Sequence, residues 1–536
     1  MTWFNRLLGS ALATMLCSGV ESFAAVRLPA VFSDNMVVQQ GKPLRIWGLA
    51  EPGEVVSAAM AGRNGSAKAE ADGKFKLELP ALSAEKDSGA LDLIITGGDA
   101  KAIQFKNVVV GEVWLCSGQS NMRLTVKECA NAEAEIAAAA SDSIRLFYVP
   151  DADSTEPQFT MKSQWRACSP KSVAGFSAAA YYFGRELHRK LNVPIGLIDS
   201  SRGYSPAEAW LPEDLLATNP ITKPILDRQA TLKPRYEELE KNYVDDLARW
   251  KAEQRASTQP ATQSSATALP AATQPVRPRP RRVWGVDRRL RPAGCYNAML
   301  YPLAPYSLAG VAWYQGESNA TRAEQYQTML PMLIQHWRAL FDQAELPFCI
   351  VQLTVHVNKE LNIDSSWAEL REAQRLTAQS VPQTGLAVTI DIGEPYNIHP
   401  LNKQDVGKRL AAWALTKVYG RHDEPASPMY RSSAIEGPAI RIRFDHIGKG
   451  LLVKGDQLTG FTIAGQDRKF VPADAKIDGE TVVVSSPSVT SPAAVRYGWT
   501  DSPACSLFGI DGLPASPFRT DDWPLLTAGV RTTDWQ

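Results

Sequence analysis

The sequence lacks an excess of charge of either sign, because lysine plus arginine and aspartate plus glutamate both number 57. A chain with zero formal net charge has no global attraction to nucleic acid or to an anionic membrane. After the first residues it also contains no run close to the ~20 apolar residues that a membrane span needs. We therefore expect neither a nucleic-acid partner nor a membrane span, and 536 residues of which 44% are hydrophobic predict several folded domains.

Metal-ligand spacing is also missing. The seven cysteines are scattered without a CxxC pair, so the sequence predicts no zinc site, and nothing in it calls for a metal or an organic cofactor. At the amino terminus, Arg6 precedes an apolar stretch from Leu7 to Leu16, and small residues end the segment at Ala24. This order is typical of a cleaved export signal over residues 1–24, and it predicts a periplasmic or extracellular protein.

Three patterns of hydrophobicity divide the remaining chain. Residues 25–108 show short alternating runs such as Phe75 to Leu79, separated by glycine-containing turns, which predict a β-sandwich module. Residues 109–424 alternate apolar strands with amphipathic stretches and predict a parallel sheet covered on both faces, with core strands at Leu308 to Tyr314, Pro347 to Leu353 and Leu386 to Ile390. Residues 425–536 return to β-type runs and predict a second β-rich module.

One segment interrupts the α/β region. Apolar residues at helical spacing from Tyr236 to Trp250 predict a helix, and the Ala/Thr/Gln/Ser/Pro-rich segment that follows, about residues 253–283, is predicted to be a disordered insertion because it has little to bury.

Ser120 could carry chemistry, because Gly118-Gln119-Ser120-Asn121-Met122 leads from a predicted strand into a loop. On spacing alone a helix N-cap is the better interpretation, since serine and asparagine are good caps. A serine nucleophile needs a base, and the chain has only six histidines. Four of them lie in helical patterns or near the last module: His188, His336, His422 and His446. His399 is the best candidate because it follows a predicted strand and a polar loop at the ligand end of the sheet, while His356, after another core strand, stays open.

Four ordered blocks resemble the sialate O-acetylesterase family within the SGNH hydrolases, and the resemblance extends over nearly the whole mature chain. The blocks read Gly118-Gln119-Ser120-Asn121-Met122, Ser201-Arg202-Gly203-Tyr204-Ser205, Trp313-Tyr314-Gln315-Gly316-Glu317-Ser318-Asn319 and Ile398-His399-Pro400. This resemblance implies a flavodoxin-like three-layer α/β/α hydrolase domain between two β modules. It also implies a serine esterase that removes acetyl groups from sugar hydroxyls.

The resemblance also implies roles for individual residues. Ser120 would be the nucleophile and His399 its base. The oxyanion hole would be formed by the Ser120 and Gly203 N–H groups and by a side-chain amide, Asn319 or Gln315. The substrate pocket would include Asn121, Arg202, Tyr204 and Glu317.

Two departures from the family pattern affect the prediction. Asn397 stands where the family has an aspartate, so the third triad member is open between Asn397, Asp391, Glu394 and a Ser–His dyad. Arg202 and Tyr204 replace a tryptophan and a glycine, which suggests a changed substrate preference.

The sequence leaves three hypotheses about the function. O-acetylated sialic acids are the leading substrate, and acetyl xylan or another polysaccharide is the alternative. A weakly active or inactive carbohydrate-binding homologue stays open because of Asn397, whereas a lipase or peptidase is disfavoured because no Gly-x-Ser-x-Gly motif occurs.

Overall fold

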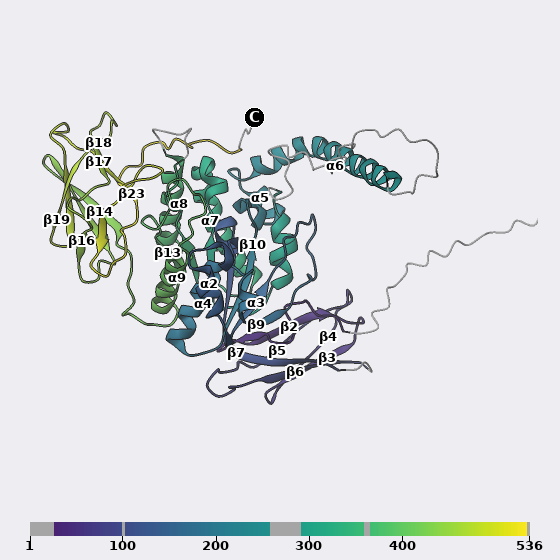
Figure 1. The fold of residues 1–536 in the computed structure, drawn as a ribbon. Helices are drawn as coiled ribbons and strands as arrows, with labels where there is room; N and C mark the ends of the chain where they lie inside the picture. The colour runs from purple at the N-terminus through teal and green to yellow at the C-terminus, as the bar shows by residue number, and fades with distance from the viewer. Residues whose placement is uncertain (1–25, 99–101, 258–290, 358–364, 533–536) are drawn as a thin grey trace, which may run out of the picture.

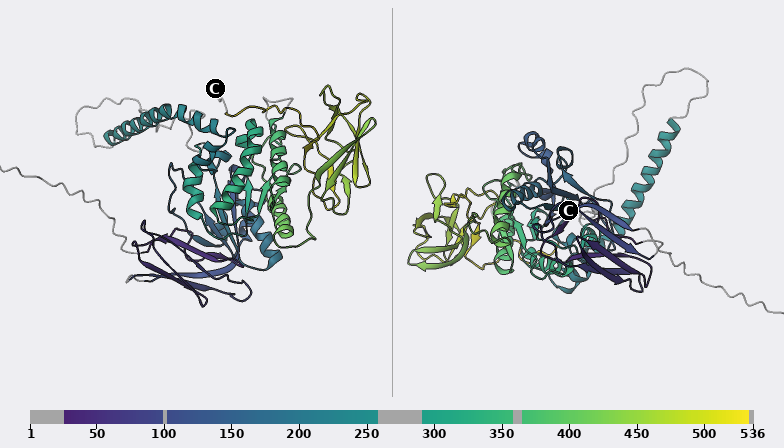
Figure 2. Two further views of the ribbon diagram at one scale, coloured as in Figure 1. Left: turned by 180° about the vertical axis from the view of Figure 1, so that it is seen from behind. Right: turned by 90° about the horizontal axis from the view of Figure 1, so that it is seen from below.

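The computed structural model describes residues 26–98, 102–257, 291–357 and 365–532. It shows a mixed α/β chain with a central mixed sheet and additional β-sheet regions before and after it (Figures 1 and 2). The predicted export signal and the part of the predicted insertion beyond residue 257 lie outside the described residues. Before that point the predicted helix is confirmed, as part of α6 (Lys223–Ser257).

The amino-terminal strands form because hydrophobic and polar residues alternate along them. In β5 the side chains of Phe75, Leu77 and Leu79 are buried and those between them are exposed, which gives the strand one core face. β2 pairs with β5, and β3 pairs with β4 and β6, all antiparallel. The strands are β1 (Val37–Gln39), β2 (Leu44–Leu49), β3 (Val55–Met60), β4 (Arg63–Lys68), β5 (Lys74–Leu79) and β6 (Leu91–Gly97).

The long strand β7 (Ile103–Gly118) joins this region to the central sheet. Its first part pairs with β6 and, through residues 109–111, with β1. Residues 112–118 of the same strand pair with β10. β7 thus runs without a break through position 108, where the sequence pattern suggested the end of the first module.

The central sheet has the strand order β13-β12-β11-β7-β10-β8-β9. Its strands are β8 (Ser141–Tyr148), β9 (Trp165–Cys168), β10 (Ile195–Ser201), β11 (Gly310–Tyr314), β12 (Phe348–Val351) and β13 (Thr384–Ala387). The prediction of an entirely parallel sheet is wrong at one edge, because β9 runs antiparallel to β8. Only a loop joins these two strands, without the crossover helix that a parallel pair requires.

Helices cover both faces of this sheet (Figure 1). Along β7, Val113 and Leu115 belong to one apolar core, whereas Trp114 and Cys116 belong to another. The first core includes α7 (Ala323–Leu340) and α8 (Ser366–Ser380), and the second includes α4 (Ala178–Leu191) and α9 (Lys403–Lys417). Within the described ranges, no helix combines the length and the apolar character needed to cross a bilayer.

Short helical segments make most of the connections. They are α1 (Ser120–Arg123), η1 (Val126–Glu128), α2 (Ala132–Ala137), α3 (Pro170–Val173), η2 (Ala207–Trp210), α5 (Glu213–Thr218), η4 (Tyr296–Leu300), η5 (Tyr301–Leu303) and η6 (Glu317–Arg322). Several of them, α1, η2 and η6 among them, follow the carboxyl ends of central strands and therefore lie where α/β sheets hold their ligands.

The carboxyl-terminal strands form two four-stranded antiparallel sheets and one two-stranded sheet around a separate apolar core. They are β14 (Met429–Glu436), β15 (Ala439–Asp445), β16 (Leu451–Val453), β17 (Phe461–Ala464), β18 (Val471–Pro472), β19 (Asp474–Asp478), β20 (Thr481–Ser485), β21 (Ala494–Tyr497), β22 (Leu507–Gly509) and β23 (Phe518–Arg519).

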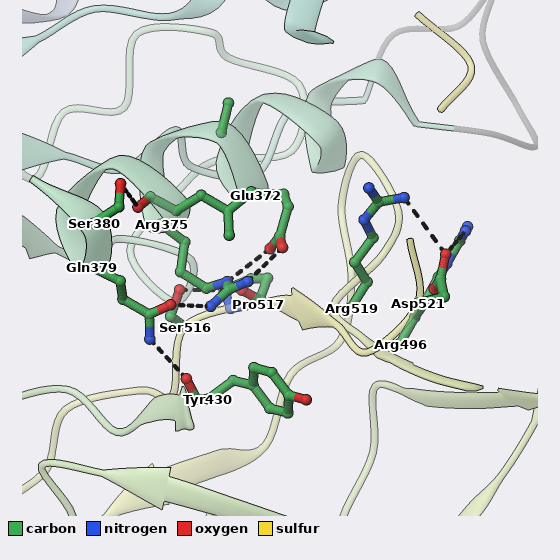
Figure 3. A network of polar contacts seen from close by, with 12 residues as sticks. Glu372, Arg375, Gln379, Ser380, Tyr430, Arg496, Ser516, Pro517, Arg519 and Asp521 are labelled. Carbon is green, nitrogen blue, oxygen red and sulfur yellow. Dashed lines mark hydrogen bonds and ion pairs between the residues drawn. The ribbon is translucent and has the colours of Figure 1, made fainter. Parts of the chain in front are cut away.

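This region packs against α8 through polar contacts (Figure 3). Arg375 forms a two-point ion pair with Glu372, with distances of 2.7 and 2.5 Å, and also donates to Gln379. Gln379 in turn donates to the carbonyl oxygen of Tyr430 at 2.7 Å. The fully buried Arg371 donates to main-chain carbonyl groups of the loop after β21, so α8 is attached to the β sheets at two places.

The tryptophan cluster beneath the sheet provides a test of the fold. Trp337 is fully buried, its ring centroid lies 5.5 Å from that of Trp313, and its indole N–H donates to the carbonyl oxygen of Trp210 at 3.1 Å. Trp337→Ala should lower the free energy of unfolding by about 3–5 kcal/mol, because it leaves a cavity and an unpaired carbonyl group. Urea unfolding followed by circular dichroism measures this, and the more exposed Leu376→Ala on α8 serves as the control. A loss no larger than that of the control would contradict the packing described here.

Candidate active site

Ser120 is the first residue of α1, directly beyond the carboxyl end of β7. Gly118, whose φ is +137°, and the extended Gln119 make the turn. A β-carbon at Gly118 would collide with the carbonyl oxygen of Tyr314 on the neighbouring strand, so the turn requires glycine. Ser120 is half-buried at the carboxyl end of the central strand β7. Its backbone N–H lies at the start of α1 and therefore has no acceptor within the helix.

Gly203 lies against Ser120. Ser201, at the end of β10, pairs with Gly118, which places the two loops side by side. A β-carbon at Gly203 would lie 4.0 Å from Cβ of Ser120. Gly203 thus lies within van der Waals reach of the serine side chain.

The two unusual residues of this loop lie in different surroundings. The side chain of Arg202 is buried and donates to the carbonyl oxygen of Ala152 at 3.1 Å. Tyr204 has a φ of +64° and is 54% exposed, so of the two side chains it is the one that solvent reaches.

Hydrogen bonds connect the loops that follow β7, β10 and β11. The Gln119 side-chain oxygen accepts the N–H groups of Gly316 at 3.3 Å and Ser318 at 3.2 Å. The Ser318 hydroxyl donates to the carbonyl oxygen of Tyr204 at 3.2 Å. The three loops therefore form one connected edge around Ser120.

Asn319 is fully buried in η6 with a fixed amide orientation. Its Oδ1 accepts the Ala207 N–H at 2.9 Å and Gln315 Nε2 at 2.6 Å, and its Nδ2 donates to Glu208 Oε2 at 2.9 Å. Because a backbone N–H can only donate, the amide oxygen must face Ala207. Gln315 therefore helps to hold the Asn319 amide in place. Of the two hydrogens on Asn319 Nδ2, one is bound by Glu208, and no described protein group accepts the other.

The amide of Asn121 connects the serine loop to the histidine loop. Its Nδ2 donates to the carbonyl oxygen of Ile398 at 2.9 Å, next to His399, and to Glu317 Oε1 at 2.5 Å. Its Oδ1 accepts from Lys403 Nζ at 2.7 Å. Asn121 and Glu317, which the sequence placed in the substrate pocket, are therefore largely engaged in holding the site together.

Burial and charge set the protonation states here. Burial lowers the pKa of Lys403 to about 8 and raises the pKa of Glu317 above its usual value. The pKa of the half-buried His399 is lowered by burial first, then by the charge of Lys403, and Glu128 opposes this shift. His399 is consequently neutral near pH 7, which is the form that can accept a proton.

The three candidates for a third triad member are all engaged elsewhere. Asn397 Oδ1 accepts the backbone N–H of His399 at 3.0 Å, and Asn397 Nδ2 donates to Glu394 at 3.1 Å. Asp391 forms a two-point ion pair with Arg409, with distances of 2.6 and 2.9 Å. Each of these side chains is therefore positioned by a group other than the imidazole.

The remaining histidines take other positions. His188 bonds the carbonyl group of Val193 at 2.8 Å within α4 and its loop, and His336 contacts the Tyr296 hydroxyl at 3.2 Å. His356 packs 5.5 Å from the Trp367 ring, and its backbone N–H donates to the carbonyl oxygen of Asp501 at 3.2 Å. Its protonated form lowers the pKa of His399.

Sequence reasoning missed Lys403, Glu128 and Glu208. Lysine is rarely fully buried, so Lys403 four positions after His399 suggests an exposed helix start. Glu128 could have been noticed from the Thr125-x-x-Glu128 capping box, which the structure contains. The role of Glu208 depends on partners more than 100 positions away and has no local signal.

Neither metal ligation nor disulfides appear in the described parts of the chain. No three His, Cys, Asp or Glu side chains come together there in a metal-binding arrangement. The six cysteines found there are all free thiols.

Comparisons with known proteins agree with one another. Residues 292–416 match the family model described as "Carbohydrate esterase, sialic acid-specific acetylesterase". Mouse sialate O-acetylesterase is 29% identical over 549 residues, covering 91% of this chain and 93% of that protein. The human sialate O-acetylesterase is 27% identical over 571 residues, covering 96% of each chain.

A solved structure is also similar over nearly the full length. The crystal structure of a carbohydrate acetylesterase from Xanthomonas citri superimposes with a TM-score of 0.74 at 33% identity. The match covers 93% of this chain and all of the other.

Replacement of Lys403 tests the electrostatics around His399. Lys403→Met should raise the pKa of the His399 imidazole, because a cation that opposes its protonation is removed. Titration of carbon-13-labelled histidine by NMR measures the shift. Lys408→Met, at an exposed ion pair on the same helix, is the control and should leave the His399 pKa in place. An unchanged or lowered pKa in Lys403→Met would contradict the assignment of this charge.

Proposed function

This chain belongs to the sialate O-acetylesterase family of carbohydrate esterases and is a carboxylic ester hydrolase, and from that premise we propose that it removes O-acetyl groups from sialic acids through an acyl-enzyme on Ser120. We further propose that its central α/β region is an SGNH-type hydrolase domain and that residues 1–24 direct export to the periplasm or the exterior.

The proposed reaction has two steps. His399 takes the proton of the Ser120 hydroxyl as its oxygen attacks the acetyl carbonyl carbon, and the protonated imidazole then gives that proton to the leaving sugar oxygen. His399 then takes a proton from water as the water oxygen attacks the acetyl-serine carbonyl carbon, and it returns this proton to the Ser120 oxygen as the acyl bond breaks and acetate leaves. The oxyanion of each tetrahedral intermediate would be met by the Ser120 and Gly203 N–H groups and by the second amide hydrogen of Asn319.

The observation that carries this proposal is the convergence of four separate loops at one sheet edge. Gly203 lies against Ser120, Gln119 binds the loop that leads to Asn319, and Asn121 binds the carbonyl group beside His399. Residues spread over positions 118 to 399 thus meet around a half-buried serine, which supports a shared chemical role for them.

For the third member we propose a Ser–His dyad. Asn397, Asp391 and Glu394 are each held by other groups, and the amide of Asn397 fixes the main chain of His399. The dyad lacks a contacting carboxylate to stabilise the imidazolium, so it should be slower than a full triad.

A basic hollow beside the serine helix supports an anionic sugar as the substrate. A cavity of about 610 Å³ is lined by Tyr148, Lys162, Arg166 and Lys171 among others. The Arg123 guanidinium of α1 lies 4.5 Å from the centroid of the Tyr148 ring, which connects the hollow to the helix that starts at Ser120. Ser120 and His399 do not line this cavity, so we propose that the sugar extends from the serine toward it. Three cations there suit the carboxylate of a sialic acid better than a neutral xylan chain.

Replacement of Ser120 tests the chemical step. Ser120→Ala should lower kcat for p-nitrophenyl acetate and for O-acetylated sialic acid by about a factor of 10³ or more, because the nucleophile is absent. Released acetate and p-nitrophenol are the measurements.

The exposed Ser433→Ala in β14 is the matched control and should keep full activity. Equal activity of Ser120→Ala and the wild type would refute the serine mechanism. Faster acetate release from acetylated xylan than from O-acetylated sialic acids would instead identify the alternative substrate, and no release from any of them would identify an inactive homologue.

Asn397→Asp tests the dyad. The carboxylate keeps an acceptor for the His399 N–H and adds negative charge beside the imidazole, so kcat should stay the same or rise and the acidic limb of the pH profile should move to higher pH. Asn64→Asp, at an exposed position of β4, is the control and should leave kcat and the pH profile unchanged. A large fall in kcat for Asn397→Asp alone would show that the amide itself has a specific role.

A further inference from the structure

A buried ion pair lies directly behind Asn319. Glu208, in η2, is 4% exposed, and its Oε2 accepts from Asn319 Nδ2 at 2.9 Å. Its Oε1 accepts from Arg322 Nη2 at 2.6 Å, and Arg322 is also 4% exposed. Because all three side chains are buried, their hydrogen bonds are strong and restrict the amide.

Further contacts hold the pair in place. Arg322 Nη1 donates to Gln325 Oε1 at 2.5 Å. Gln325 Nε2 donates to the carbonyl oxygens of Ile221 at 2.7 Å and Arg531 at 2.9 Å. The carboxylate of Glu208 is thereby fixed by elements from three distant parts of the chain.

Two adjacent residues of η2 hold opposite ends of the same amide. The Ala207 N–H binds Asn319 Oδ1, and the Glu208 carboxylate binds one hydrogen of Nδ2. The amide plane can then neither rotate nor flip, so its second N–H bond is held in a single orientation. Such restraint matters because an oxyanion donor contributes only if it is aligned before charge develops.

The charge of the pair is as important as its geometry. A lone buried carboxylate next to an oxyanion donor would repel the negative charge of the transition state. The guanidinium of Arg322 cancels that charge, so the pair orients Asn319 while adding no net charge to the site.

We infer that Glu208, neutralised by Arg322, is a positioning residue that aligns the Asn319 amide for the oxyanion. This inference rests on the proposed function, in which Asn319 supplies one oxyanion donor.

The first test is Glu208→Gln in the full chain with p-nitrophenyl acetate. The neutral amide of glutamine can present either end to Asn319, so kcat should fall about 10- to 100-fold with KM changed less than about 2-fold, since only the transition state needs the aligned donor. Titration of Ser120 with a fluorophosphonate gives kcat per reactive site and separates this loss from misfolding.

Glu372→Gln is the matched control. It also alters a buried Glu–Arg pair, with Arg375, but on α8 at the carboxyl-terminal sheets (Figure 3). Its kcat should equal that of the wild type. An equal loss of kcat in both variants would overturn the inference in favour of a general stability effect.

Arg322→Met tests the charge argument. This variant leaves Glu208 unpaired and negative, so its kcat should fall below that of Glu208→Gln. The double variant Glu208→Gln/Arg322→Met should recover part of that loss. A double variant slower than Arg322→Met would overturn the charge argument.

Asn319→Ala decides whether Glu208 acts through the amide. In the Asn319→Ala background, Glu208→Gln should change kcat less than about 2-fold, because the group that it aligns is gone. The same fold loss in both backgrounds would overturn the inference. If Asn319→Ala keeps its activity while Ser120→Ala has none, the inference fails and the serine mechanism stands; activity retained in Ser120→Ala removes the proposed function itself.

Discussion

The side-chain amide of Asn121 is the interaction on which the arrangement of the site depends. One hydrogen of the amide reaches the carbonyl group before His399, the other reaches Glu317, and its oxygen receives the ammonium group of Lys403. Because Asn121 follows Ser120 directly, any displacement of the histidine loop must break a bond to the residue next to the serine. This position needs a side chain that donates two hydrogen bonds and accepts one, and asparagine is the smallest side chain that can do so.

Buried charges surround this centre, and each has a specific partner. Lys403 is bound by Asn121, and Glu208 is bound by Arg322 and Asn319. An unpaired charge in such a place would be costly, so these pairs favour one arrangement over its alternatives. Polar contacts therefore hold the site together. The sheet itself is stabilised by the packing of Trp313, in β11, against Trp210 and Trp337.

Sequence alone predicted the features that depend on local order. The choice of Ser120 and His399 stays a prediction, made because each follows a strand and a turn and because the blocks around them resemble a known family. The strands β11 and β12 were recognised from short apolar runs and are confirmed. β13 was found two residues away from its true start, and the antiparallel β9 was missed because Trp165 to Cys168 is too short to reveal its direction. The partners of Asn319 could not be predicted, because hydrogen bonds between residues more than 100 positions apart depend on packing that no local pattern encodes.

The continuity of β7 has a consequence for how the chain can be divided. The amino-terminal strands and the serine loop share this one strand, so a cut at position 108 would divide a hydrogen-bonded ladder and expose its edges. The first β region and the strand that leads to Ser120 therefore form one structural unit. The carboxyl-terminal sheets share no strand with the central one and are joined to it by side-chain contacts of α8.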